Sequence, residues 1–188
     1  MADKHWGLRL ISGPDNIRGL PKAADSGIWT AGDILTLDAT GKVDPRTAAN
    51  SDADVEDAFL GVGLTTEAAD ANAETNYTFV PVSVFTTEQV WSIKVEDSKR
   101  AYNDYEIGVA YKVGYIGTAV SYDVGYISGE TAVTVTADEF YYLSVTAASD
   151  LSGAVVVATP GRGAGVDVQY GGRVHIRFTP HACMQITG

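Results

Sequence analysis

The sequence predicts an all-β protein, a small β-barrel or sandwich with an additional β-rich region and an extended N-terminal arm. Apolar and β-branched residues recur with a period of two, as in residues 79–85 and 173–178. Turn signals built on glycine separate these runs, for example Ala31-Gly32-Asp33 and Thr40-Gly41-Lys42. Short strands punctuated in this way are typical of sandwiches and barrels.

The first 28 residues predict an extended N-terminal arm, followed by a β-rich domain over residues 29–188. Apolar residues are scattered between Trp6 and Ile28, and Gly13-Pro14, Gly19 and Pro21 interrupt any regular element. Such a segment suits an arm that lies on a partner. It equally suits an irregular lead-in packed on its own domain.

Six runs predict strands: 79–85, 90–95, 133–136, 142–146, 154–158 and 173–178. Residues 154–158 are continuously apolar, as expected for a strand covered on both faces. The last run has an apolar face of Val174, Ile176 and Phe178, and a polar face of Arg173, His175 and Arg177. Residues 52–59 and 67–74 predict loops with at most a turn or two of helix.

One internal repeat stands out, because residues 110–117 recur eleven positions later as residues 121–128. Two interpretations remain open. The copies could be consecutive hairpin strands with matching packing, in which glycine leaves a gap on one face. Alternatively they could form an exposed ladder that binds a protein or a sugar, made of Tyr111, Tyr115, Tyr122 and Tyr126.

The chain is acidic, with 24 acidic and 13 basic residues and a formal charge of −11. This balance argues against direct binding of nucleic acid or of an anionic membrane. Residues 44–76 hold eight acids and one base, whereas residues 160–188 hold three arginines and one acid. These segments are either solvated or complementary ends through which copies or partners meet.

Sequence features also bear on the compartment. Cys183 is the only cysteine, so an intrachain disulfide is impossible. The first residues lack the pattern of a secretory signal, and no run approaches the roughly 18 apolar residues of a membrane span. We therefore expect a chain made and kept in a soluble, reducing compartment, or released by lysis.

Motifs for chemistry are weak, so we expect no catalytic residues, no cofactor and no metal. Asp52, Asp54, Glu56 and Asp57 do not meet the EF-hand pattern, since Asp57 occupies the glycine position. His175, His181 and Cys183 lack a fourth ligand and a standard zinc spacing. The glycine-rich residues 161–165 lack the Gly-Lys-Ser/Thr ending of a phosphate loop.

Residues 31–44 read as Gly-Asp, hydrophobic strand, turn and strand, and residues 59–65 follow as Phe-Leu-Gly-Val-Gly-Leu-Thr. Gly61 lacks a side chain, so this second segment can cross closely over the hairpin. The phrase resembles the small β-barrel of capsid decoration (cement) proteins of tailed bacteriophages. Residues 105–113 and the strand 174–178 also look like the C-terminal half of that family. The greater length of this chain implies an inserted or appended β region around residues 113–150.

The resemblance implies a structural virion protein that binds the outer surface of a capsid and bridges major capsid subunits. It implies a homo-oligomer, with a trimer favoured, that is made in the host cytoplasm and has no active site. On this hypothesis Trp6, Leu8, Leu10 and Trp29 provide apolar anchors, and Arg173 and Arg177 provide charge-assisted contacts. The alternatives are a tail-tube or head-fibre protein, a carbohydrate-binding or adhesin module that uses the tyrosine ladder, and an enzyme.

Overall fold

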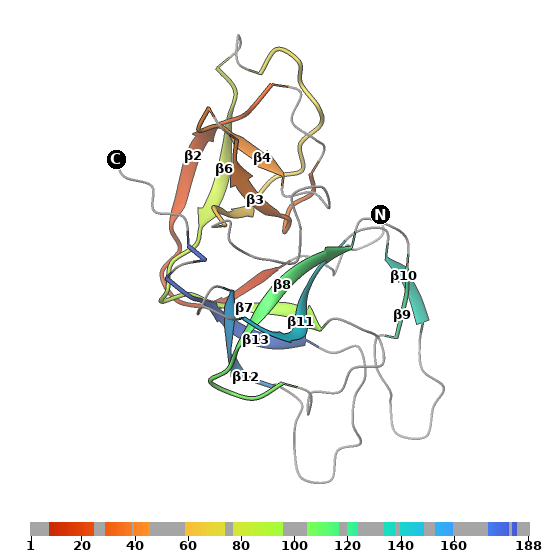
Figure 1. Cartoon of the computed structure of the whole chain (residues 1–188). Helices are drawn as coiled ribbons and strands as arrows, with labels where there is room; N and C mark the ends of the chain where they lie inside the picture. Colours follow the sequence, from red (N-terminus) through yellow and green to blue (C-terminus); the bar gives the residue numbers. More distant parts are fainter. Residues whose placement is uncertain are drawn as a thin grey trace.

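The computed structural model describes residues 8–24, 29–38, 40–45, 59–73, 77–95, 105–116, 120–123, 134–137, 140–148, 153–159, 173–180 and 182–183. Every regular element within these ranges is a β-strand, which confirms the predicted all-β class. The strands form a closed five-stranded barrel, a second five-stranded sheet and a separate two-stranded ribbon. Figure 1 shows the second sheet stacked on one end of the barrel, with the ribbon beside it.

The barrel closes through five strands in the spatial order β7 (Val90–Val95), β11 (Phe140–Ala147), β8 (Ala110–Ile116), β12 (Ala154–Ala158) and β13 (Arg173–Phe178). Closure comes from antiparallel pairing of β13 with β7, and the β7–β11 pair is the parallel one. Strand β1 (Arg9–Ser12) adds to β7 from outside the ring. In this closed ring each of the five strands pairs with a neighbour on both edges, so the paired residues present no free edge.

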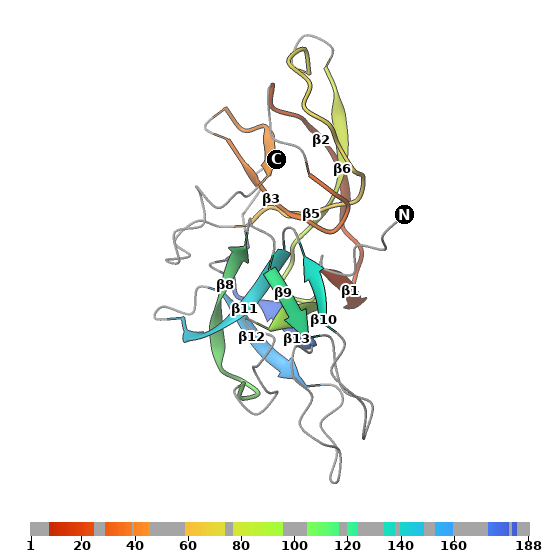
Figure 2. The same cartoon turned by 90° about the vertical axis from the view of Figure 1, so that its right-hand side faces the viewer.

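The second sheet has the order β2 (Ile17–Pro21), β6 (Phe79–Val84), β5 (Gly61–Gly63), β3 (Ile34–Leu37) and β4 (Val43–Pro45). The predicted hairpin is present as β3 and β4, and its turn has Gly41 at φ +79°. The Asp38 carboxylate accepts hydrogen bonds from the backbone amides of Thr40 (2.8 Å) and Lys42 (2.9 Å), which fixes the turn. Figure 2 shows β2 and β6 running side by side away from the barrel.

Over residues 8–21 the chain departs from the expected extended arm, because β1 joins the barrel and β2 joins the second sheet. Gly13 connects them at φ +107°, and a Cβ atom there would lie 2.8 Å from backbone atoms of Glu88 and Gln89. The glycine–proline pair therefore turns the chain from one sheet to the other. Residues 1–7 and 25–28 lie outside the described residues.

The second sheet has a hydrophobic cluster of its own and also contributes residues to the core of the barrel. Ile34 and Val62 project from the second sheet into the hydrophobic cluster that fills the barrel. Three aromatic rings join the layers, with Phe178 centred 4.0 Å from Phe85 in a stacked pair and 5.5 Å from Phe59 edge-on. Because a fully buried large apolar side chain contributes about 1.5–3 kcal/mol, this shared core couples the two sheets strongly.

An additional β region was expected around residues 113–150. Among the described residues of that interval, β8 and β11 belong to the barrel, and β9 (Val120–Asp123) and β10 (Thr134–Ala137) form the separate ribbon. The two copies of the repeat consequently have different partners, since β8 pairs with β11 and β12, whereas β9 pairs with β10. The described strands of the repeat are not hairpin partners of each other.

Gly114 shows what the glycine of the repeat does. The side chain of Tyr142, on the neighbouring strand, lies across it, and a Cβ atom at Gly114 would be 2.3 Å from Tyr142 Cζ. The expected gap is thus filled by an aromatic ring, a known way to stabilise glycine in a sheet.

We expect Gly114→Ala to lower the free energy of unfolding by about 1 kcal/mol, because the far end of a tyrosine side chain can move aside. In a Tyr142→Ser background, with the ring gone, the same substitution should cost less than half as much. Urea denaturation of the four proteins measures this coupling. Equal costs in both backgrounds would contradict the contact.

Candidate functional site

The apolar residues predicted to anchor a partner are largely used by the chain's own core. Leu8 is 5% exposed in the barrel core, Leu10 packs against that core, and Trp29 is 2% exposed in the core of the second sheet. In this structure the side chains of Leu8 and Trp29 are therefore not available to a partner. Trp6 lies outside the described residues.

The two predicted arginine contacts have different surroundings. Arg173 is held against β7, where its Nε donates to Ser92 Oγ (2.8 Å) and its Nη2 donates to the Ser92 carbonyl (2.7 Å). Arg177 is exposed on the outer face of β13. The predicted two faces of this strand are confirmed, since Val174, Ile176 and Phe178 are buried on the inner side.

The tyrosine ladder proposed for sugar binding loses its first member, because Tyr111 is 5% exposed and belongs to the barrel core. Its hydroxyl accepts a hydrogen bond from the Glu106 amide (2.9 Å), and its ring packs edge-on against Tyr105 at 5.2 Å. The side chains of Tyr115 and Tyr122, and the whole of Tyr126, lie outside the described residues.

The candidate metal and nucleophile residues form no site in the described part of the chain. No group of three or more His, Cys, Asp or Glu side chains there could hold a metal ion. Burial raises the pKa of the Cys183 thiol to about 11, so the thiol is neutral and a poor nucleophile. His181, the acidic residues 46–58 and the glycine-rich residues 161–165 lie outside the described ranges. The described residues also contain no helix that could cross a membrane.

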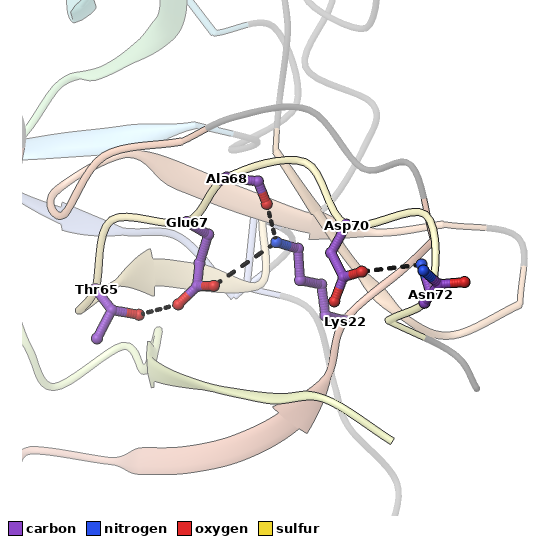
Figure 3. Close-up of polar contacts among 6 residues, drawn as sticks. All are labelled: Lys22, Thr65, Glu67, Ala68, Asp70 and Asn72. Atoms are coloured by element: carbon purple, nitrogen blue, oxygen red, sulfur yellow. Dashed lines mark hydrogen bonds and ion pairs between the residues drawn. The ribbon is translucent and has the colours of Figure 1, made fainter. Parts of the chain in front are cut away.

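Sequence reasoning missed a buried lysine in the second sheet. Lys22 follows β2, and its side chain is 1% exposed. Its ammonium group donates to the Ala68 carbonyl, lies 3.6 Å from Glu67 Oε2, and sits 4.9 Å from the centre of the Trp29 ring. Figure 3 shows the lysine reaching from the end of β2 to the loop that carries Glu67 and Ala68.

All of these partners favour a positive charge, so the arrangement holds an ammonium ion in place. Within the described residues, no second carboxylate forms an ion pair with Lys22. The arrangement therefore does not have the groups of a catalytic site. The Glu67 carboxylate also accepts from Thr65 Oγ1 (2.8 Å), and the backbones of Trp29 and Glu67 bond to each other. The contacts of Lys22 and Glu67 therefore hold the loop of residues 64–73 against the sheet.

The contacts that hold this loop also fix the position of an exposed apolar surface. The Thr78 amide donates to Ala73 and the Thr78 carbonyl accepts from Lys22, which joins the loop to the start of β6. Tyr77, just before, is 80% exposed and adopts φ +52°, a left-handed conformation that is rare for tyrosine.

One face of the second sheet is covered near the barrel and open beyond it. The β3–β5 part of that face packs into the barrel core through Ile34 and Val62, as described above. Further along, on β2, on β6 and just after β5, the residues of this face are exposed or half-exposed. We name these residues the apolar outer face: Ile17, Pro21, Leu64, Phe79 and Pro81.

The five residues of the apolar outer face are uncharged, and the Asp15 carboxylate lies at one end of the face, where it accepts a hydrogen bond from Ser83 Oγ opposite Ile17 (3.1 Å). Phe79 lies opposite Pro21 in register, and the Leu64 amide donates to the Pro81 carbonyl (3.1 Å). Its large side chains are well exposed, at 55% for Ile17, 62% for Phe79 and 40% for Leu64. In a chain with a net charge of −11, a group of exposed apolar side chains of this kind is a candidate interaction surface.

Comparison of the chain with protein-family models, with curated proteins and with solved structures finds no significant match.

Three cationic side chains, Lys94, Arg173 and Arg9, lie near one another on the outside of the barrel. Lys94 is 6% exposed on β7, and its pKa is lowered to about 8 by burial and then by the neighbouring charges of Arg173 and Arg9. In the unfolded chain the same ammonium titrates near 10.5. Between these values the unfolded state binds more protons, so stability rises with pH through this window.

We expect the free energy of unfolding to increase by about 1 kcal/mol from pH 8 to pH 9 through Lys94, and a Lys94→Met variant to lack this increase. Above pH 9 the buried thiol of Cys183 acts in the opposite direction, because the folded state keeps a proton that the unfolded state loses. Urea denaturation of both proteins between pH 7.5 and 9 separates the two effects. Identical slopes in both proteins would contradict the assignment.

Proposed function

We propose that this chain is a structural virion protein that binds the outer surface of a bacteriophage capsid. It would stabilise the shell by bridging major capsid subunits, as a homo-oligomer and not as an enzyme. The observation that carries the proposal is the apolar outer face of the second sheet, where Ile17, Leu64 and Phe79 expose large apolar side chains. The resemblance of residues 31–44 and 59–65 to decoration proteins supports the same assignment.

The physical basis is selective binding. A protein that binds only the assembled shell stabilises it by mass action, and no catalytic group is needed. Phe79 and Leu64 offer large apolar contacts without the cost of removing charges from water. The acidic character of the rest of the chain would keep unbound copies apart in solution.

The proposal is tested first by mass spectrometry of density-banded particles from the source culture, with the molar ratio of this chain to the most abundant shell protein as readout. A ratio near one, or a simple fraction, is the expected result. Absence from particles, with recovery in the soluble or cell-surface fraction, would contradict the proposal and favour an adhesin. Recovery only with tails or head fibres would favour the other virion roles.

A second test addresses the surface itself. Undecorated particles are mixed with purified protein, and bound protein is measured after sedimentation. Phe79→Ser and Ile17→Ser should each weaken binding at least about tenfold, which corresponds to the loss of one well-packed apolar contact. The matched control is Ile11→Ser on β1, because this isoleucine is 48% exposed and belongs to the barrel sheet, whereas the apolar outer face lies on the second sheet. Equal binding by all three variants would exclude this face as the contact.

A further inference from the structure

A second candidate surface is a groove on the outside of the barrel, which shares no residue with the apolar outer face. It has a volume of about 450 Å³ and is formed by β12, β13 and the turn before β7. Its lining residues are Thr87, Val155, Val157, Arg177, Phe178, Thr179 and Pro180.

The floor of this groove is apolar where a solvated strand would be polar. The run 154–158 predicts a strand covered on both faces, but only its inner residues, Ala154 and Val156, are buried. Val155 and Val157 are half-exposed and line the groove instead. The strand therefore has the composition of one whose outer face is also covered.

One charged side chain, that of Arg177, lines the groove together with these valines. Arg177 lies directly opposite Val155 in register and is exposed. Within the described part of the chain its guanidinium group makes no hydrogen bond or ion pair. A fitting occupant would place an apolar side chain on the valines and a carboxylate beside the arginine.

The chain itself presents such a pair of side chains on the turn that pairs with β12. The turn before β8 carries Glu106, which is exposed, and Ile107, which is 63% exposed. Gly108 at φ +91° lets this turn project, and its amide donates to the Val156 carbonyl (2.8 Å) on the opposite side of β12 from β13. The groove and the turn thus both contact β12, the groove through Val155 and Val157 and the turn through Val156. Ile107 does not line the groove of its own chain.

The turn is also rigid. The Glu106 amide donates to the buried Tyr111 hydroxyl, and the Val109 amide donates to the Glu106 carbonyl (3.2 Å). A turn that is already ordered loses little conformational entropy when it binds.

We propose that the groove binds the 106–108 turn of a second copy of this chain, with Ile107 on the valine floor and Glu106 paired with Arg177. The same contact serves a reciprocal pair and a closed ring, because each copy gives one turn and receives one. It brings opposite charges together in a chain whose net charge otherwise disfavours association. The inference concerns self-association alone and does not depend on binding to a shell.

The test is sedimentation of the purified full chain over a range of concentrations. The expected result is a concentration-dependent assembly that Ile107→Asp weakens at least about tenfold in its dissociation constant. The matched control is Ile11→Asp, because Ile11 is 48% exposed on β1, does not line the groove and should leave self-association unchanged. Circular dichroism and thermal melting confirm that each variant is folded.

A charge exchange tests the ion pair directly. Arg177→Glu and Glu106→Arg should each weaken assembly, and the double variant should recover most of the loss, since the opposite charges are restored with exchanged positions. A wild-type chain that stays monomeric at high concentration would overturn the proposal. So would an assembly that is indifferent to Ile107→Asp, or a double variant no better than the single ones.

Discussion

Gly61→Ala is expected to be among the most destabilising single substitutions in the chain, at about 4 kcal/mol or more. A Cβ atom at Gly61 would lie 2.2 Å from the Ser83 carbonyl oxygen and 2.9 Å from Val84 Cα. These are backbone atoms of β6, so no side chain can rotate away. Ordinary overpacking costs about 1–3 kcal/mol, and a clash with a paired strand exceeds this range.

The structural consequence follows from the place of β5 between β3 and β6. To relieve the contact, β5 must move away from β6 and give up the pairing of Gly61 with Val84 and of Val62 with Ser83. Val62 also reaches the barrel core, so the disturbance passes to the barrel.

The matched control is Gly19→Ala on neighbouring β2. A Cβ atom at Gly19 has no heavy atom within 4 Å, so this substitution should change stability by less than about 0.5 kcal/mol. Urea denaturation of both variants measures the difference. Similar stabilities for the two would show that β5 and β6 are not as closely apposed as the structure has them.

Local patterns predicted much of the strand content. The alternation in residues 173–178 identified β13 and its two faces, because one side of a strand in a closed barrel must be apolar. The glycine turn at Gly41 identified the β3–β4 hairpin. The absence of a side chain at Gly61 predicted a close crossing, although the tightest approach is to β6 and not to the hairpin.

Pairings between distant segments were beyond these patterns. Alternation shows that a strand has two faces but not which segment covers each face. The parallel pairing of β7 with β11 joins residues about fifty positions apart and leaves no local signal. For the same reason Trp29 read as a surface anchor, although Leu35, Leu60 and Val80 enclose it in the structure.

The candidate surface was hidden by a related ambiguity. Phe79 and Val80 are adjacent apolar residues on opposite faces of β6, and only the tertiary structure shows that Val80 is 1% exposed and Phe79 62% exposed. Lys22 follows a proline in an unremarkable stretch. Its partners Glu67 and Ala68 lie about 45 residues further along the chain.

The buried lysine gives the second large prediction, because removing its partner should cost more than removing the lysine. Glu67→Ala leaves the Lys22 ammonium buried with, among the described residues, only the Ala68 carbonyl and the Trp29 ring, and should lower the free energy of unfolding by about 2–3 kcal/mol. Lys22→Met keeps the packing volume and removes the charge. It leaves Glu67, which is 24% exposed, in contact with Thr65, so the cost should be about 1 kcal/mol or less.

The double variant decides between an ion-pair effect and a packing effect. If the cost of Glu67→Ala arises from an uncompensated buried charge, then adding Lys22→Met removes that charge, and the double variant should be more stable than Glu67→Ala alone. If the carboxylate acts only by filling space or by holding Thr65, the two costs should add. Urea denaturation of the wild type, both single variants and the double variant measures this sign. Because Lys22 fixes the loop of residues 64–73, the order of stabilities should be matched by the loop's susceptibility to proteolysis, with Glu67→Ala cleaved fastest.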